Sequence, residues 1–175
     1  IFNKKAKVLG GLPNTFVFKL YFDNYALTVR KEVKICMIHM YNTYESMCFA
    51  CGKQNPIGLK LQFREENDEY ITVFTPGKEH QGYPGIIHGG ITATILDEVC
   101  ARYVFAKGVP AFTAALNVRY RKGIPIGEPV TFKSWIVNHK GRLFNVEAKA
   151  ILKDGTVAAE AYAKIMKAKK LEVTE

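Results

Sequence analysis

The chain lacks the features that mark membrane proteins and disulfide scaffolds. No run among its 175 residues approaches the roughly 18 uninterrupted apolar residues of a membrane-spanning helix. The first residues carry scattered lysines where a signal peptide has an apolar core. Its 4 cysteines are too few for a disulfide framework in a chain of this length. We therefore expect a soluble, cytoplasmic protein with reduced thiols and no membrane span.

Hydrophobic residues make up 48% of the chain, which is enough for one core and favours one main domain. Lys and Arg (25) exceed Asp and Glu (16), which gives a net charge of +9. Such a charge can attract nucleic acid, anionic lipid or a phosphorylated small molecule. The basic residues are spread along the chain, so we expect a solvated surface and no nucleic-acid partner.

Residues 1–47 are rich in aromatic side chains and carry no recognisable chemical motif. We assign 1–47 to an N-terminal extension of unknown role and 48–175 to the functional domain. Across this boundary, Cys36-x-x-His39 and Cys48-x-x-Cys51 have a spacing typical of zinc ligands. Cys36 lies in a strand-like segment where a thiol can simply pack, so the sequence leaves open whether this set binds metal.

The pattern from residue 59 onward predicts two strands, one long helix and four more strands. The helix, 89 to about 107, is apolar on most of its circumference, which is typical of a buried helix. Gly108-Val109-Pro110 ends it, and Lys153-Asp154-Gly155-Thr156 is a strong hairpin signal. The strands are expected at 59–63, 70–74, 112–120, 129–138, 143–152 and 157–166.

This order predicts an antiparallel α+β domain in which the sheet curls around the helix. One sheet of this kind leaves its edges open, and open edges favour pairing with another copy of the chain. We therefore expect a homo-oligomer, at least a dimer.

The most informative stretch is His88-Gly89-Gly90-Ile91-Thr92-Ala93-Thr94-Ile95-Leu96-Asp97. Backbone N–H groups at a helix start have no partner in the helix and favour an anion, so Gly89 and Gly90 can form an oxyanion hole. The glycines could also merely let the loop approach the sheet. Asp97 inside an apolar helix is either a reactive carboxylate or a structural acid bonded to a strand or a Thr.

The spacing of Gly89 and Asp97 constrains how they can cooperate. Eight residues on an α-helix correspond to about 12 Å along the axis and roughly 80° around it. One chain therefore cannot bring both groups to the same carbonyl. If they do cooperate, Gly89 of one subunit meets Asp97 of a neighbour whose helix runs antiparallel, across a twofold interface.

The stretch from His88 to Asp97, with Gly85 before it and Gly108-Val109-Pro110 and 116–120 after it, closely resembles the hotdog-fold acyl-CoA thioesterases of the phenylacetate-degradation type. Residues 48–52 and 55–59 also resemble the opening of many bacterial members. The resemblance extends from 48 to about 167. It implies a hotdog fold, in which a curled antiparallel sheet wraps around one long central helix.

The resemblance also implies roles in the reaction. Asp97 would act as general base on water or as nucleophile on the thioester, and the Gly89 N–H would hold the thioester oxygen. His88 would lie near the thioester, or else be a structural histidine. Thr113 would help to position water, or else make a cross-strand hydroxyl contact.

The same resemblance implies substrate-binding positions at Gly90, Asn117 and Arg119. Lys140 and Arg142 lie in a turn that could meet the phosphates of CoA, because Arg and Lys suit phosphate groups. We expect no cofactor and no catalytic metal. The partners implied are an acyl-CoA substrate and further copies of the chain, as a dimer or a dimer of dimers.

The chain departs from its relatives in one respect. They often carry an Asn six residues before the motif's His, where this chain has Gly82, so His80 or Gln81 would have to supply that contact. Glu98 is a second carboxylate beside Asp97, and its position 100° around the helix predicts that it faces elsewhere.

We expect an acyl-CoA thioesterase. A non-catalytic acyl-CoA binding or regulatory module on the same fold is the alternative. A hydratase or dehydratase ranks last, because the first helical turn has no carboxylate. The acyl group stays undefined, since pocket depth depends on which of five apolar side chains face the groove: Tyr83, Ile95, Val99, Tyr103 and Phe105.

Overall fold

The computed structural model describes residues 47–168. The chain divides into two units between Thr43 and Tyr44, and every described residue belongs to the second unit. Cys36 and His39 lie outside the described residues. The domain boundary expected at residues 47 and 48 therefore stays a prediction.

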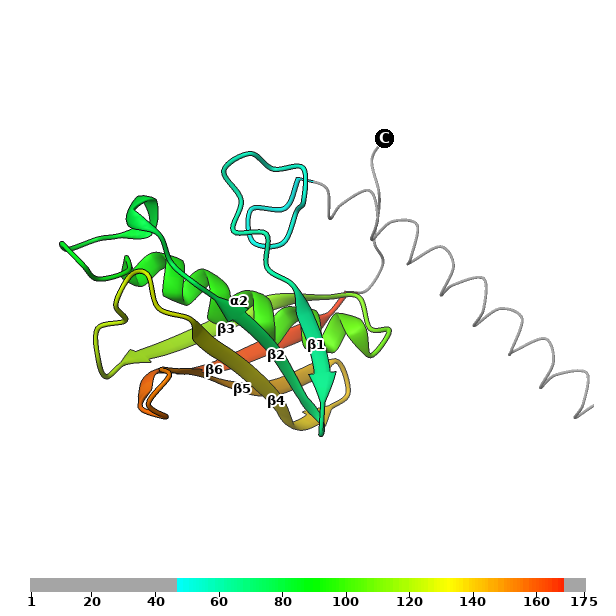
Figure 1. Ribbon diagram of the computed structural model, residues 1–175. Coiled ribbons are helices and arrows are strands. Elements are labelled where there is room, and N and C mark those ends of the chain that lie inside the picture. The colour runs from blue at the N-terminus through cyan, green and yellow to red at the C-terminus, as the bar shows by residue number, and fades with distance from the viewer. Residues whose placement is uncertain (1–46, 169–175) are drawn as a thin grey trace, which may run out of the picture. The chain divides into compact units, whose positions relative to one another are not determined.

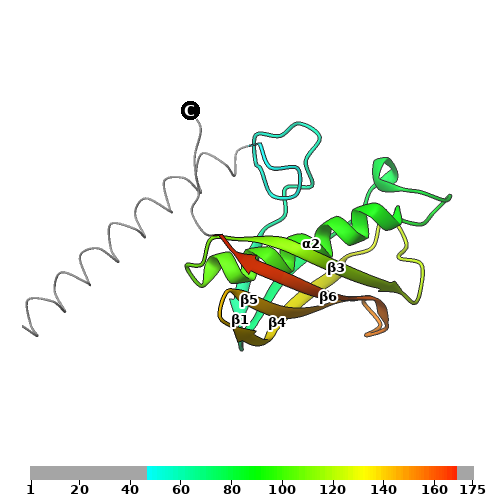
Figure 2. The same ribbon diagram turned by 180° about the vertical axis from the view of Figure 1, so that it is seen from behind.

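Six antiparallel strands form one sheet in the order β1-β2-β4-β5-β6-β3. Figures 1 and 2 show the strands curling around the long helix α2. A short 3-10 turn, η1 (Lys78–His80), lies between β2 and α2. The elements are β1 (Phe63–Glu66), β2 (Glu69–Phe74), α2 (Gly89–Ala106), β3 (Ala111–Tyr120), β4 (Val130–Lys140), β5 (Leu143–Ile151) and β6 (Val157–Lys167).

The core lies between α2 and the concave face of the sheet. The buried side chains of α2 include Ile95, Leu96, Val99, Cys100 and Val104. Facing them, β5 and β6 present a row of small buried residues that lets the helix approach the sheet backbone closely: Ala148, Ala150, Ala159, Ala161 and Ala163. This packing confirms the predicted buried helix and the α+β class.

Two hydroxyl groups fix α2 against the sheet and the first hairpin. The fully buried Ser134 on β4 donates its hydroxyl to the Val99 carbonyl at 2.8 Å. Tyr103 stacks on Tyr70 and donates its hydroxyl to the Asp68 carbonyl at 2.8 Å. These bonds set both the depth and the rotation of the helix.

The first strand differs from the sequence prediction. Residues 59–62 are not strand, and β1 begins only at Phe63. Lys60 has a φ of 55°, which interrupts extended backbone. The Leu59 and Leu61 N–H groups instead donate to carbonyls of residues 49 and 50. The apolar alternation correctly predicted that Leu59 and Leu61 are buried. Their backbone partners, however, belong to a preceding loop and not to a strand.

The remaining strands match the prediction to within one or two residues. The Lys153–Thr156 turn forms as expected, because Asp154 Oδ1 accepts the Thr156 N–H at 2.9 Å and Gly155 has a φ of 83°. Within residues 47–168 no helix combines the length and apolar character of a membrane span.

Candidate active site

His88 caps the N-terminus of α2. Its Nδ1 atom accepts the Gly90 N–H at 2.9 Å, and its carbonyl accepts the N–H groups of Ile91 and Thr92. In a neutral imidazole whose Nδ1 accepts, the proton is on Nε2. His88 therefore fixes the first turn and keeps an N–H donor on its other nitrogen.

The two motif glycines have different surroundings. A Cβ on Gly90 would lie 2.9 Å from His88 Nδ1, so the His88 cap leaves too little room for a side chain at this position. A Cβ on Gly89 would only touch the Tyr120 ring at 3.5 Å, an ordinary contact. The Gly89 N–H also has no acceptor within residues 47–168. Of the two amides, Gly89 is therefore the one free to bind an oxygen.

Tyr120, at the end of β3, holds this turn from the other side. Its hydroxyl donates to the Gly89 carbonyl at 2.8 Å. Sequence reasoning assigned Tyr120 no role, because an exposed Tyr at a strand end carries no signature. The contact orients the peptide plane that precedes Gly90.

Asp97 is half-buried on α2, and Thr113 on β3 donates its hydroxyl to Asp97 Oδ1 at 2.6 Å. The short distance is typical of an O–H group bonded to a carboxylate. The sequence offered a cross-strand contact as the alternative for Thr113, and the structure instead directs this hydroxyl to the helix. One carboxylate oxygen is thereby held, and Oδ2 makes no recorded hydrogen bond within the described residues.

Strand β3 runs antiparallel to α2. Tyr120 contacts Gly89 at one end, and Thr113 contacts Asp97 further along. Gly89 and Asp97 lie on one continuous helix, so the separation of about 12 Å inferred from their spacing holds. The Gly89 amide and the Asp97 carboxylate of one chain therefore cannot meet on one small group.

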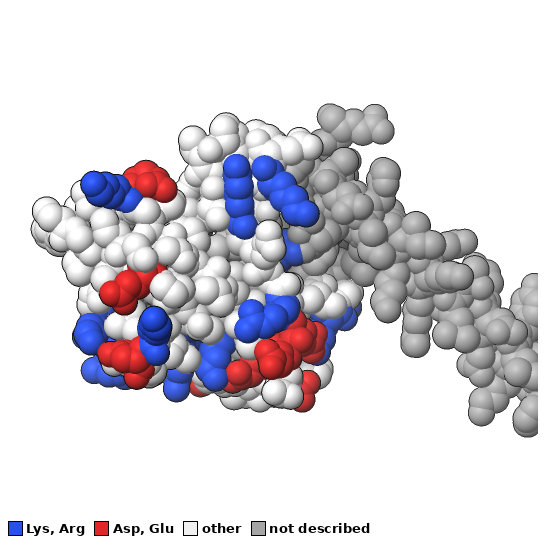
Figure 3. Space-filling model, in the orientation of Figure 1, with Lys and Arg blue, Asp and Glu red and all other residues white. Residues whose placement is uncertain are grey.

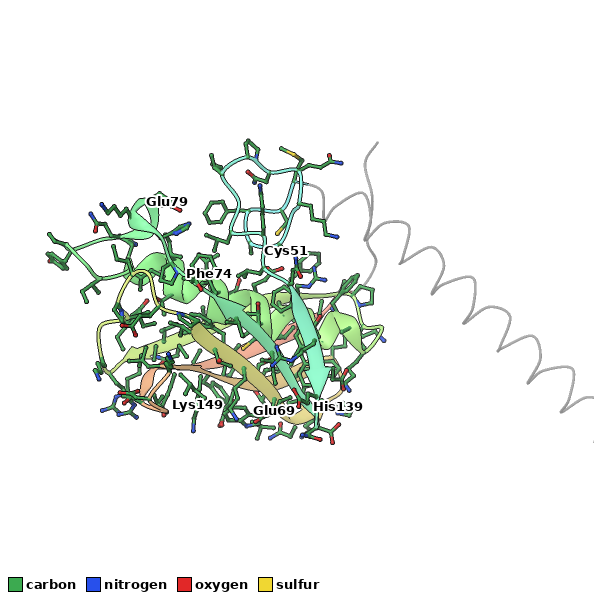
Figure 4. The ribbon with its side chains drawn as sticks, in the orientation of Figure 1. Cys51, Glu69, Phe74, Glu79, His139 and Lys149 are labelled. Carbon is green, nitrogen blue, oxygen red and sulfur yellow. The ribbon has the colours of Figure 1, made fainter. Side chains whose placement is uncertain are left out.

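The loop before α2 is held by its own side chains. His80 Nδ1 accepts the Gly77 N–H at 2.9 Å, and the His80 ring packs edge-on against Phe74, which Figure 4 shows near this loop. Gln81 Oε1 accepts the Gly85 N–H. A Cβ on Gly82 would lie 3.2 Å from His88 Cα, so the glycine lets His88 approach closely. His80 and Gln81 therefore hold the loop, and neither makes a recorded contact with Asp97 or Gly89.

The residues expected to bind CoA lie in two groups. Asn117 and Arg119 are exposed and alternate with residues that face α2, so they lie on the convex face of the sheet. Lys140 is the last residue of β4, and Arg142 in the turn that follows donates from Nε and Nη2 to the Lys167 carbonyl. Register with β6 places Arg119 opposite Glu160, seven residues from Lys167, which corresponds to about 23 Å. One chain does not bring these groups together.

Charge on the surface is mixed. On the face drawn in Figure 3, Lys and Arg alternate with Asp and Glu along the lower rim. Pairs of this kind include Lys133 with Glu69, Arg121 with Glu160, and Lys107 with Glu65. Part of the basic charge is therefore neutralised locally, as expected of a solvated surface.

The side chains considered as lining for an acyl group mostly belong to the core. Ile95 and Val99 are fully buried, and Tyr103 is 2% exposed. Tyr83 is 81% exposed on the loop before α2, and Phe105 is half-buried. Only Tyr83 and Phe105 are thus accessible to a ligand in the single chain.

Comparisons with known proteins agree with this arrangement. The family model described as "Thioesterase superfamily" matches residues 84–159. Mouse (Mus musculus) acyl-coenzyme A thioesterase THEM4 is 39% identical over 72 residues, 41% of this chain and 31% of the mouse protein. The chain thus spans about a third of the length of that curated relative.

Among solved structures, a thioesterase superfamily protein has a TM-score of 0.65 at 25% identity, covering 69% of this chain and 60% of that one. A hypothetical thioesterase from Streptococcus pneumoniae, solved with coenzyme A, has a TM-score of 0.58 at 16% identity, covering 62% and 85% of the two chains. Two further structures of a Streptococcus pneumoniae hypothetical thioesterase carry alanine in place of an aspartate and of a threonine sixteen positions later.

Proposed function

We propose that the protein hydrolyses an acyl-CoA thioester to a carboxylic acid and CoA, because residues 84–159 match the thioesterase superfamily model and the domain has a hotdog fold. The observation that carries the proposal is the Asp97 carboxylate held by the Thr113 hydroxyl at 2.6 Å beside an apolar core. Asp97 and Thr113 are separated by sixteen positions, like the two residues replaced in the streptococcal protein.

Two routes are open to Asp97. As general base, it takes a proton from water, whose oxygen attacks the thioester carbonyl; the tetrahedral oxyanion then collapses and expels the CoA thiolate. As nucleophile, a carboxylate oxygen attacks the carbonyl itself, the C–S bond breaks and the CoA thiolate leaves, and water then hydrolyses the resulting anhydride. In both routes Thr113 fixes Oδ1 and leaves Oδ2 to react. His88 Nε2–H is a donor available to the thioester.

The oxyanion donor would come from a second copy of the chain. β3 pairs only with β6 among the described strands, so its other edge is free. An antiparallel pairing of two β3 edges centred between Leu116 and Asn117 would place Thr113 beside Tyr120 of the partner subunit. Tyr120 contacts Gly89, and Thr113 contacts Asp97. The pairing would therefore bring Gly89 of the partner subunit to Asp97.

The same pairing would bring together the two groups of residues expected to bind CoA. In one copy, one end of β3 lies next to Lys167 and Arg142. The pairing would place this end beside the end of β3 that carries Arg119 in the other copy. Asn117 and Arg119 from one subunit and Lys140 and Arg142 from the other would then face one CoA molecule. Gly90 would contribute through its place in the oxyanion turn.

The test is thiol release from a panel of acyl-CoA esters by the wild-type protein and by Asp97→Asn. Loss of a general base is expected to lower kcat by roughly 10²–10⁴-fold. Asp68→Asn makes the same chemical change at an exposed turn position, where a positive φ of 59° suits Asn, and should leave the rate unchanged. Full activity of Asp97→Asn would refute the assignment.

The panel also separates the enzyme from an acyl-CoA binding module. Tight binding of acyl-CoA without thiol release, by wild-type protein that is oligomeric in solution, would favour the non-catalytic module. Sedimentation measurements on the same sample test the expected dimer or dimer of dimers.

A further inference from the structure

Outside the proposed active site, three metal-binding side chains converge between a loop and α2. Cys48 and Cys51 come from the loop before β1, and Glu98 comes from α2. The two Sγ atoms and a Glu98 carboxylate oxygen all lie within 4.8 Å of one another. Figure 4 shows Cys51 at the base of this loop, next to α2.

The loop holds both cysteines in a fixed turn. The Cys48 carbonyl accepts the Gly52 N–H at 2.8 Å, and the Phe49 and Ala50 carbonyls accept the N–H groups of Leu59 and Leu61. Cys51 and Ala50 are buried. A Cys-x-x-Cys pair on a tight turn is a usual source of two zinc ligands.

The charges of this cluster favour a cation. Arg102 Nη1 donates to Cys51 Sγ at 3.2 Å. Two thiolates and one carboxylate carry three negative charges, and a divalent cation together with Arg102 would neutralise them. Arg102 would then act as the outer hydrogen-bond donor that metal thiolates commonly have.

We propose that Cys48, Cys51 and Glu98 bind a zinc ion, with water in the fourth position. Zn–S bonds of about 2.3 Å place tetrahedral ligands about 3.8 Å apart, so movements of about 1 Å close the site. Both thiols lose their protons to solvent on binding, which makes the affinity fall with decreasing pH. The ion joins the loop to the middle of α2, one residue from Asp97.

This site differs from the set expected from cysteine spacing. There, Cys36 and His39 would complete the coordination, whereas the proposed site takes its third ligand from α2. The proposed site predicts that zinc is lost when Glu98 is replaced and kept when Cys36 and His39 are replaced. The four-ligand set predicts the reverse.

The experiment uses the full 175-residue chain, purified with reductant and loaded with Zn²⁺, and then with Co²⁺ as a spectroscopic probe. Elemental analysis is expected to find about one zinc per chain, and Co²⁺ should give thiolate charge-transfer and tetrahedral d–d absorption bands. Glu98→Gln, Cys48→Ser and Cys51→Ser should each weaken zinc affinity at least about tenfold. Cys100→Ser removes a buried α2 thiol outside the cluster and should leave zinc content unchanged.

A Cys36→Ser/His39→Ala double variant should also keep its zinc. Loss of zinc in this variant with retention in Glu98→Gln would overturn the proposal in favour of the four-ligand set. Absence of zinc and of the Co²⁺–thiolate bands in reduced wild-type protein would overturn it outright, and the wild-type spectrum does not depend on any variant folding.

Discussion

The hydroxyl of Thr113 offers the sharpest probe of the proposed site. Thr113→Val keeps the size and β-branched shape of the side chain, so strand β3 should form as before. The change removes the O–H that donates to Asp97 Oδ1 at 2.6 Å. Asp97 then loses the group that orients it.

The expected loss of rate in Thr113→Val follows from the strength of this hydrogen bond. Hydrogen bonds to charged groups contribute about 1.5–3 kcal/mol, and water can replace part of this at a half-buried carboxylate. A loss of about 1.5–2 kcal/mol at the transition state corresponds to a fall in kcat of roughly 10–30-fold. Thr113→Ser restores the hydroxyl and should recover most of the rate.

Steady-state kinetics on the best acyl-CoA of the panel would measure both kcat and KM. The fall should lie in kcat, because Thr113 holds the reacting carboxylate and not the CoA portion. In an Asp97→Asn background, Thr113→Val should cost little more, since the two residues act as a unit. A kcat within about twofold of wild type for Thr113→Val, or equal losses for the Ser and Val variants, would refute this role.

Three further predictions concern stability and reactivity. Ser134→Ala should lower the free energy of unfolding by about 1–2 kcal/mol in urea titrations, because it removes the buried bond to the Val99 carbonyl; an unchanged midpoint would contradict this. Burial raises the pKa of Cys100, so iodoacetamide should modify it far more slowly in folded than in urea-unfolded protein, as mass spectrometry of the Cys100 peptide would show. Arg121 lowers the pKa of Glu160 below 4.5, so this pair stabilises the fold above about pH 4.5 and the contribution is lost as pH falls further; Glu160→Gln should flatten that part of the stability curve.

Most of the fold was predictable because its signals are local. The apolar circumference of α2 and the alternation in β3 to β6 reflect which side chains face one core. The predicted start of β1 was wrong because the backbones of Leu59 and Leu61 pair with a loop that precedes them. A left-handed Lys60 decides that outcome, and Lys has no preference that reveals it.

The motif singled out the residues of the candidate site, whereas their contacts depend on how the chain packs. Thr113 donates to Asp97 Oδ1, a Thr contact that the sequence analysis gave only as the structural alternative for Asp97, and Glu98 does face away toward the Cys48 and Cys51 turn. Tyr120 was missed because its role depends on the antiparallel packing of β3 on α2. The convergence of Glu98 with two loop cysteines was equally invisible, since spacing shows only ligands that are close in sequence.

The two edges of the sheet differ in a way that limits how many copies can associate. Among the described strands, β3 offers ten residues of free edge, whereas β1 offers four, three of which are charged: Arg64, Glu65 and Glu66. Short, charged edges resist pairing with another strand. A sheet with one usable edge can add a single copy, after which no long edge is left. We therefore expect edge-to-edge pairing of the described strands to end in a closed pair, without the open-ended fibres that two long edges would permit.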